Sequence, residues 1–120
     1  MATIKESSTN RKNKKIIQGY CPVTFTLEKI GGRWKPLILY NLRSGVMRYG
    51  ELKRSIPAIT EKMLIQHLRE LEADDLVIRE AKPVVPPHVE YRLTEAGKTL
   101  EPILNGMAEW GMTRVREGRR

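Results

Sequence analysis

The residues best suited to recognising a partner lie in residues 59–77, where cationic and amide side chains recur at helical spacing. At about 100° per residue, Lys62, Gln66 and Arg69 fall on one face of a helix. The opposite face is an apolar stripe made by Leu64, Leu68 and Leu71. Glutamine can form paired hydrogen bonds with adenine, and lysine donates to guanine acceptors, so such a helix is suited to a DNA major groove. The alternative is an ordinary surface helix whose polar residues are solvated.

Six side chains along this helix are candidate DNA contacts. Thr60 is a good N-cap, because its hydroxyl accepts a hydrogen bond from the first turn, and with the free amides there it is placed to contact phosphate. Arg69 lies further along and is expected to meet the DNA backbone. Met63 and His67 flank the face; the alternatives are partial core burial for Met63 and a solvent or core-edge position for His67. The full set is Thr60, Lys62, Met63, Gln66, His67 and Arg69.

Three helices are predicted before this one. Cys21-Pro22 begins the first, because proline is tolerated at the first helical position, and Gly31-Gly32 ends it. The second has Pro36 in its opening turn and an apolar run nearly all round, so we expect it to lie centrally in the core. That run contains Leu37, Ile38, Leu39 and Leu42. Residues 49–55 predict a short third helix. A short turn then leads to the amphipathic helix, which makes the pair a helix-turn-helix candidate.

After Asp75 the periodicity changes. Residues 77–81 and 88–93 predict two strands, and the three prolines of residues 82–87 exclude a helix between them. Thr94 caps a last helix, in which Pro102 is the place where a bend is expected. The predicted fold class is therefore mostly α with a small β-hairpin (α+β), a winged helix-turn-helix with additional N- and C-terminal helices.

Further cations lie at helix starts, on the third helix and on the hairpin. Candidate phosphate contacts are Arg33, Arg48, Tyr49, Lys53 and Arg54. Simple solvation is the alternative for part of this set. On the wing, Lys82 and His88 flank the tip and are candidates for an adjacent minor groove or phosphates, a bare loop being the alternative.

The first and last helices hold more apolar residues than so small a core requires. We expect a dimer interface formed by Val23, Phe25, Leu27, Leu100, Ile103, Leu104, Met107 and Trp110. The alternative is that all of them pack within one chain. A two-fold dimer would place two recognition helices about 34 Å apart and would require an inverted-repeat operator.

The distribution of charge favours a polyanionic partner. The chain of 120 residues carries a net charge of +8. Basic tails are predicted at residues 1–19 and 113–120, flanking a domain at residues 20–112. Tails of this kind can serve solubility alone, so the segregation inside the domain matters more. Residues 28–69 contain nine lysines and arginines but only three glutamates. The next six residues contain four acidic residues and no basic residue.

Several classes of protein are disfavoured. A single cysteine excludes an intrachain disulfide, and with only two histidines we expect no metal site and no cofactor. Pairing Cys21 with His67 or His88 as nucleophile and base lacks an orienting third group, so we expect no enzyme. The sequence has no apolar run long enough to span a membrane and no visible secretory signal, so the cytoplasm is the expected location.

Several separated motifs resemble one known family. CPV, LEKIGGRWKPLIL, RYGELKRSIPAITEKMLIQHLRELEADDLV, VPPHVEYRLTEAGKTL and AEWG, spread in this order over residues 21–111, are similar to the HxlR family of bacterial winged-helix transcriptional regulators. The resemblance implies a homodimer that binds operator double-stranded DNA through the fourth helix and the wing, and we expect it to act as a repressor. It implies dimer contacts from the first and last helices. Asp75 departs from the family's usual glycine, and we expect a slightly costlier helix end there.

Cys21 is a candidate redox or electrophile sensor. It lies at a helix N-terminus, where the dipole favours the thiolate. In relatives a cysteine at this point of the motif senses oxidants or electrophiles, which implies an oxidant or small-molecule effector here. The alternative is a small buried residue that caps the helix. For the whole chain the rival to DNA binding is a winged-helix module that binds an acidic protein partner, which the cations on residues 59–77 disfavour.

Overall fold

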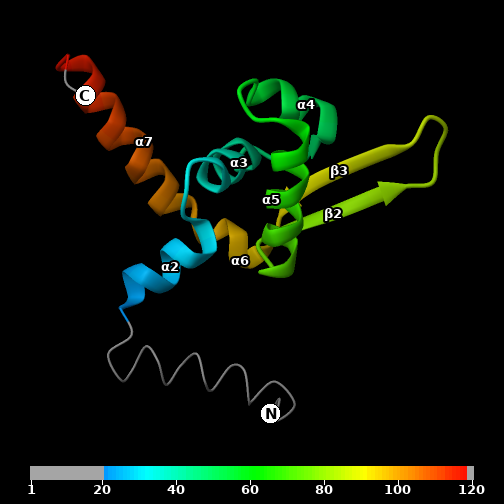
Figure 1. Ribbon diagram of the computed structural model, residues 1–120, viewed down its shortest axis with the longest axis horizontal. Helices are drawn as coiled ribbons and strands as arrows, with labels where there is room; N and C mark the ends of the chain where they lie inside the picture. The colour runs from blue at the N-terminus through cyan, green and yellow to red at the C-terminus, as the bar shows by residue number, and fades with distance from the viewer. Residues whose placement is uncertain (1–20, 119–120) are drawn as a thin grey trace, which may run out of the picture. The chain divides into compact units, whose positions relative to one another are not determined.

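The computed structural model describes residues 21–118 (Figure 1). These residues form two units, one ending at Gly31 and the other beginning at Gly32. The first contains α2 (Pro22–Ile30), which begins at the proline expected there. Its last turn closes through a hydrogen bond from the Gly31 amide to the Leu27 carbonyl at 2.7 Å. The predicted tail of residues 1–19 lies outside the described residues.

Three helices of the second unit build most of its core. They are α3 (Trp34–Leu42), α4 (Tyr49–Ser55) and α5 (Glu61–Ala73). As predicted, α3 is central, because it packs against α4, α5, α7 and the sheet. Its Ile38, Leu39 and Leu42 are buried, whereas Leu37, which the sequence placed in the same run, is exposed.

A three-stranded antiparallel sheet adjoins these helices. It contains β1 (Met47–Arg48), β2 (Val77–Lys82) and β3 (His88–Leu93) in the order β1-β3-β2. The two predicted strands are confirmed. The short strand β1, which pairs Met47 with Tyr91, was not predicted, since two residues show no periodicity.

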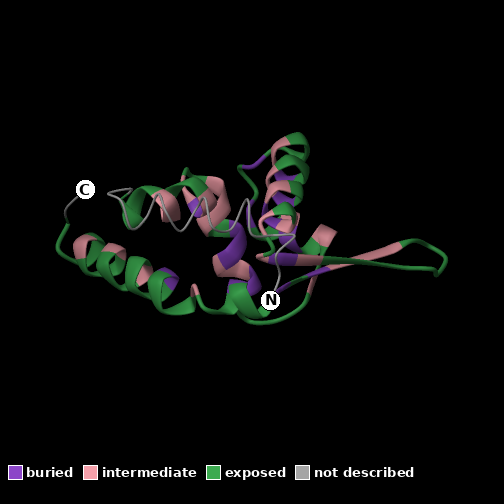
Figure 2. Ribbon diagram, turned by 90° about the horizontal axis from the view of Figure 1, so that it is seen from below, coloured by how far each residue is buried: buried purple, intermediate pink, exposed green. Residues whose placement is uncertain are grey.

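The hairpin register gives β2 and β3 two different faces. Val77 pairs with Leu93 and Arg79 pairs with Tyr91, and because side chains alternate along a strand these residues share one face. Val77, Tyr91 and Leu93 are buried, so this face is directed at the core. The other face carries Glu80, Lys82, His88, Glu90 and Arg92. Beyond the core the hairpin extends as a largely exposed arm (Figure 2).

At the end of α5, Asp75 has the left-handed conformation on which the expected cost of this helix end depends. The Leu76 amide donates to the Leu71 carbonyl at 2.9 Å and the Asp75 amide donates to the Glu72 carbonyl at 3.0 Å, the bond pattern of a Schellman motif. Asp75 has φ +60°, the left-handed conformation that glycine adopts most easily. Its carbonyl accepts a hydrogen bond from the Thr94 hydroxyl at 2.7 Å, which ties the turn to the next helix.

The single last helix predicted from the sequence is two helices. Thr94 does cap a helix, accepting a hydrogen bond from the Gly97 amide at 2.9 Å, but this α6 (Glu95–Lys98) is short. A new helix, α7 (Glu101–Arg116), follows with Pro102 in its first turn, where a missing amide proton costs nothing. Pro102 thus starts a helix rather than bending one. Because α7 continues to Arg116, the predicted tail boundary at residue 113 falls inside it. Among residues 21–118, no helix is long and apolar enough to cross a membrane.

Candidate nucleic-acid interface

The amphipathic division of α5 is confirmed. Leu64, Leu68 and Leu71 are buried, while Lys62, Gln66 and Arg69 are all exposed. Thr60 caps the helix as predicted, its hydroxyl accepting a hydrogen bond from the Met63 amide at 3.1 Å. The face with the three polar side chains is therefore accessible to a partner.

One flank of this face is organised by a carboxylate that bridges two helices. Glu70 Oε1 lies 2.7 Å from Lys35 Nζ of α3, and Glu70 Oε2 accepts a hydrogen bond from Gln66 Nε2 at 3.3 Å. The hydrogen bond from Lys35, followed by the one from Gln66, holds the pKa of Glu70 below its usual value. Glu70 therefore stays ionised over a wider pH range than a free glutamate.

His67 and Met63 lie on this flank, beside the open face, in the core-edge and partly buried positions that the sequence left open as alternatives. Contact between them and DNA stays a prediction. The His67 ring is mostly covered, and neither of its nitrogens has a hydrogen-bond partner of good geometry. The nearest charged atom is Glu70 Oε1, 3.5 Å from Nδ1. Met63 is half-buried. In a helix, these positions lie about 100° or more away from Lys62 and Arg69.

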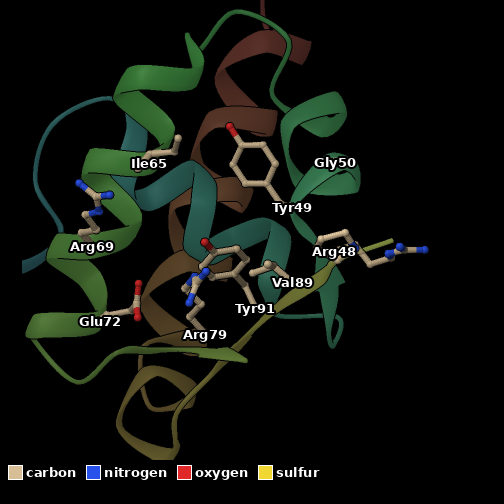
Figure 3. Close-up of a pocket in the computed structure, with 10 residues that line it drawn as sticks. Arg48, Tyr49, Gly50, Ile65, Arg69, Glu72, Arg79, Val89 and Tyr91 are labelled. Atoms are coloured by element: carbon tan, nitrogen blue, oxygen red, sulfur yellow. The ribbon is translucent and has the colours of Figure 1, made fainter. Parts of the chain in front are cut away.

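The other flank of α5 opens into a groove that faces the hairpin. The groove has a volume of about 790 Å³ and receives side chains from α4, α5 and the sheet (Figure 3). Its cationic members are Arg48, Arg69 and Arg79. Glu72 is its one acid, and the remaining lining comprises Tyr49, Gly50, Ile65, Pro87, Val89 and Tyr91. A concave surface with this charge balance is suited to an anion such as a DNA phosphate.

Two tyrosines at the groove are held by charged neighbours. Burial, followed by the nearby Glu61 carboxylate, raises the pKa of Tyr49, whose hydroxyl donates to Glu61 Oε1 at 3.5 Å. Burial also raises the pKa of Tyr91, and a hydrogen bond with Arg79 partly opposes this effect. Figure 3 shows Arg79 extending from β2 beside Tyr91. Arg79 and Tyr91 were missed by the sequence reasoning, because only strand register reveals which hairpin residues face α5.

The predicted phosphate contacts at helix starts have different surroundings. Arg48 precedes α4, and its amide donates to Glu51 Oε1 at 2.8 Å. Arg54 is exposed, Lys53 is half-buried, and the Arg33 guanidinium lies 4.3 Å from the centre of the Trp34 ring. Arg48 and Tyr49 are brought to the groove beside α5, whereas Arg33, Lys53 and Arg54 do not line it.

The two predicted wing residues lie on the hairpin face opposite the groove. Both are next to Glu90, with His88 Nε2 2.6 Å and Lys82 Nζ 3.4 Å from its carboxylate oxygens. The hydrogen bond with His88, followed by the charge of Lys82, lowers the pKa of Glu90. The positive charge of Lys82 is thus partly compensated within the protein.

Most of the predicted dimer residues are exposed. Val23, Leu27, Ile103, Met107 and Trp110 are accessible, and Phe25 and Leu100 are half-buried. Leu104 is the exception and a correction: it is 2% exposed and belongs to the core of its own chain. Figure 2 shows α7, the helix that a short loop joins to the C-terminal end, coloured mostly as exposed.

Cys21 is an exposed, free thiol immediately before α2. Hydrogen bonds from the backbone amides of Thr24 and then Val23 lower its pKa, because they stabilise the thiolate. The alternative of a buried capping residue is therefore wrong.

Comparison with known proteins identifies the family to which this fold belongs. Residues 29–119 match the family described as HxlR-like helix-turn-helix. The HTH-type transcriptional regulator YybR of Bacillus subtilis is 55% identical over 91 residues, which cover 76% of this chain and 73% of YybR. Among solved structures, the redox regulator HypR in its oxidized form has a TM-score of 0.75 and 54% identity, covering 78% of this chain and 96% of that one. Diamide-treated YodB from B. subtilis has a TM-score of 0.65 and 36% identity, covering 78% and 93%. The chain belongs to the HxlR-like helix-turn-helix family of transcriptional regulators.

Proposed function

We propose that the protein is a homodimeric repressor that binds an inverted-repeat operator and responds to oxidants. The observation that carries the proposal is the open face of α5, where Lys62, Gln66 and Arg69 are exposed while the leucines behind them are buried. In the major groove, Gln66 would read adenine and Lys62 would donate to guanine. Occupying an operator that overlaps a promoter would exclude the polymerase.

When α5 lies in the major groove of DNA, the protein groove beside α5 would receive the adjoining phosphate backbone. Arg69 and Arg79 approach it from α5 and β2, and Arg48 lies at the start of α4. Contacts of this kind fix the register of a protein on DNA and carry no base information. We therefore assign the hairpin's contacts with the DNA backbone to the face that carries Arg79 and Tyr91, and Arg79 is the main contact residue.

Oxidation of Cys21 would be the regulatory step. HypR has been solved in oxidized and reduced forms, and YodB after treatment with diamide. The sequence of this chain has one cysteine, so a disulfide must join Cys21 to a second chain or to a small thiol. In the first case two thiols lose two protons and two electrons, which an oxidant such as diamide accepts.

The salt dependence of DNA binding tests the interface. A dimer that contacts roughly six to ten phosphates should give a slope of log affinity against log salt of about −5 to −9. Selection of bound duplexes from a random library first identifies the operator. The affinity for that operator is then measured by fluorescence anisotropy at several salt concentrations. A slope near −1, or recovery of duplexes without two-fold symmetry, would contradict the proposal.

A further inference from the structure

Glu70 connects the core of the protein to the face of α5 that would read bases. Its Oε1 is held by Lys35 of α3 at 2.7 Å, with His67 Nδ1 a further neighbour at 3.5 Å. The Lys35 side chain is only 12% exposed, so the carboxylate is anchored to a covered part of the protein. Its second oxygen, Oε2, accepts a hydrogen bond from Gln66 Nε2 at 3.3 Å.

This contact selects one orientation of the Gln66 amide. An ionised carboxylate only accepts hydrogen bonds, whereas an amide group has a donating end and an accepting end. Turning the amide of Gln66 by 180° would place its carbonyl oxygen next to Glu70, and two acceptors repel each other. One Nε2 proton is used by Glu70, which leaves the other proton and Oε1 as a donor–acceptor pair.

We infer that Glu70 is a positioning residue that gives Gln66 its base preference, favouring adenine over guanine. Adenine offers an N7 acceptor and an N6 amino donor to such a pair, whereas guanine offers two acceptors, N7 and O6. With one Nε2 proton held by Glu70, Gln66 cannot give both amide protons to the two guanine acceptors, and its own oxygen would meet one of them, so guanine is disfavoured. The inference rests on the proposed function, because it requires α5 to bind in the major groove.

The test measures base preference at one operator position. That position is the one at which Gln66→Ala no longer prefers one base pair over the others. Four duplexes, one with each base pair at that position, are then titrated by fluorescence anisotropy. The parent is expected to bind the adenine duplex about tenfold more tightly than the guanine duplex. Glu70→Gln supplies an amide that can both donate and accept, which permits both orientations of Gln66. The preference should then fall below about threefold.

Glu72→Gln is the matched control. It removes the same charge from the same helix at a position that lines the groove. Both substitutions reduce repulsion of DNA and should tighten binding to all four duplexes, but Glu72→Gln should leave the adenine-to-guanine ratio unchanged. Lys35→Met keeps Glu70 and Gln66 and removes only the anchor, so it should lower the ratio in the same direction. It replaces Glu70→Gln if that variant shows no cooperative thermal unfolding.

The outcomes separate this inference from the proposed function. If Gln66→Ala loses the preference and Glu70→Gln keeps it, Glu70 does not position Gln66, although the protein still reads DNA through α5. If Gln66→Ala keeps the parental ratio at every position, the inference is overturned, because Gln66 reads no base. Failure of the parent to bind any duplex would overturn both.

Discussion

At the scale of single residues, Cys21 shows how backbone geometry changes the chemistry of a side chain. Extended backbone at Cys21 places its thiol before the first turn of α2, where the amides of Thr24 and Val23 are free to donate. These amides lower the thiol pKa, so at a given pH more thiolate is present than in the unfolded chain. A thiolate, unlike a thiol, is a nucleophile.

The rate at which diamide oxidises Cys21 should therefore rise through a midpoint below that of a cysteine in the unfolded chain, because the folded pKa is lowered. Stopped-flow measurements across pH, with the urea-unfolded protein as reference, give both midpoints. Operator affinity should change on oxidation of the parent, whereas Cys21→Ser should show no response. Equal midpoints for the folded and unfolded chains would contradict the pKa assignment, and an unchanged response in Cys21→Ser would exclude Cys21 as the sensor.

At the scale of elements, the hairpin distributes its arginines between two faces. Arg79 pairs in register with Tyr91 and lines the groove, whereas Arg92, on the opposite face, forms an ion pair with Glu80 at 3.1 Å. The two arginines have the same charge and lie close together in the same sheet. Replacing each in turn therefore separates the effect of the hairpin face on DNA binding from the effect of net charge.

Arg79→Gln should weaken binding to all DNA sequences alike and reduce the size of the salt slope by about two in a dimer, since each protomer loses one phosphate contact. Arg92→Gln, the control, should change neither quantity. Arg79→Lys keeps the positive charge and should keep the salt slope. It therefore separates the loss of charge from the loss of the contact with Tyr91. Equal losses from Arg79→Gln and Arg92→Gln would show that the hairpin face does not matter.

The left-handed conformation of Asp75, in the turn after α5, has a small cost in conformational free energy. A left-handed conformation is less costly for glycine than for any other residue, while glycine also loses more entropy on folding. Asp75→Gly should therefore stabilise the protein by about 0.5–1 kcal/mol, seen as a rise of a few degrees in the midpoint of thermal unfolding. Asp74→Gly, at a residue with φ −87°, removes the same charge and should not stabilise. The explanation fails if both variants shift the midpoint equally.

At the scale of the whole molecule, α7 presents large apolar side chains to solvent. Trp110 is 70% exposed and shares one helical face with Ile103 and Met107. Exposed apolar surface of this kind is typical of an interface. Met112 is also exposed, but it lies on the opposite side of the helix.

We expect sedimentation to show a dimer at micromolar concentration. Trp110→Glu should raise the dimer Kd by about 30-fold or more, because buried tryptophans dominate interface energies. Met112→Glu introduces the same charge on the other side of α7 and should leave the Kd within about threefold. A monomeric parent, or equal effects of the two substitutions, would exclude this face as the interface.

Local patterns determined much of this protein. The stripe of Leu64 and its partners, the Thr60 cap and the strands of residues 77–81 and 88–93 all follow from spacing and residue type, which act over a few neighbours in the chain. The expectation for Asp75 came instead from the glycine that the family has at this position, and the left-handed conformation of Asp75 agrees with it. Separation of α6 from α7 was missed, since Thr99 and Leu100 carry no strong helix-breaking signal.

Only the tertiary structure decided which polar residues face one another. Arg79 joins the groove while Lys82 lies on the other side, and Glu70 is held by Lys35 from a different helix. These relations depend on strand register and helix packing, which bring together residues far apart in the sequence. Sequence periodicity gives the face of each element, but it does not say what lies opposite that face.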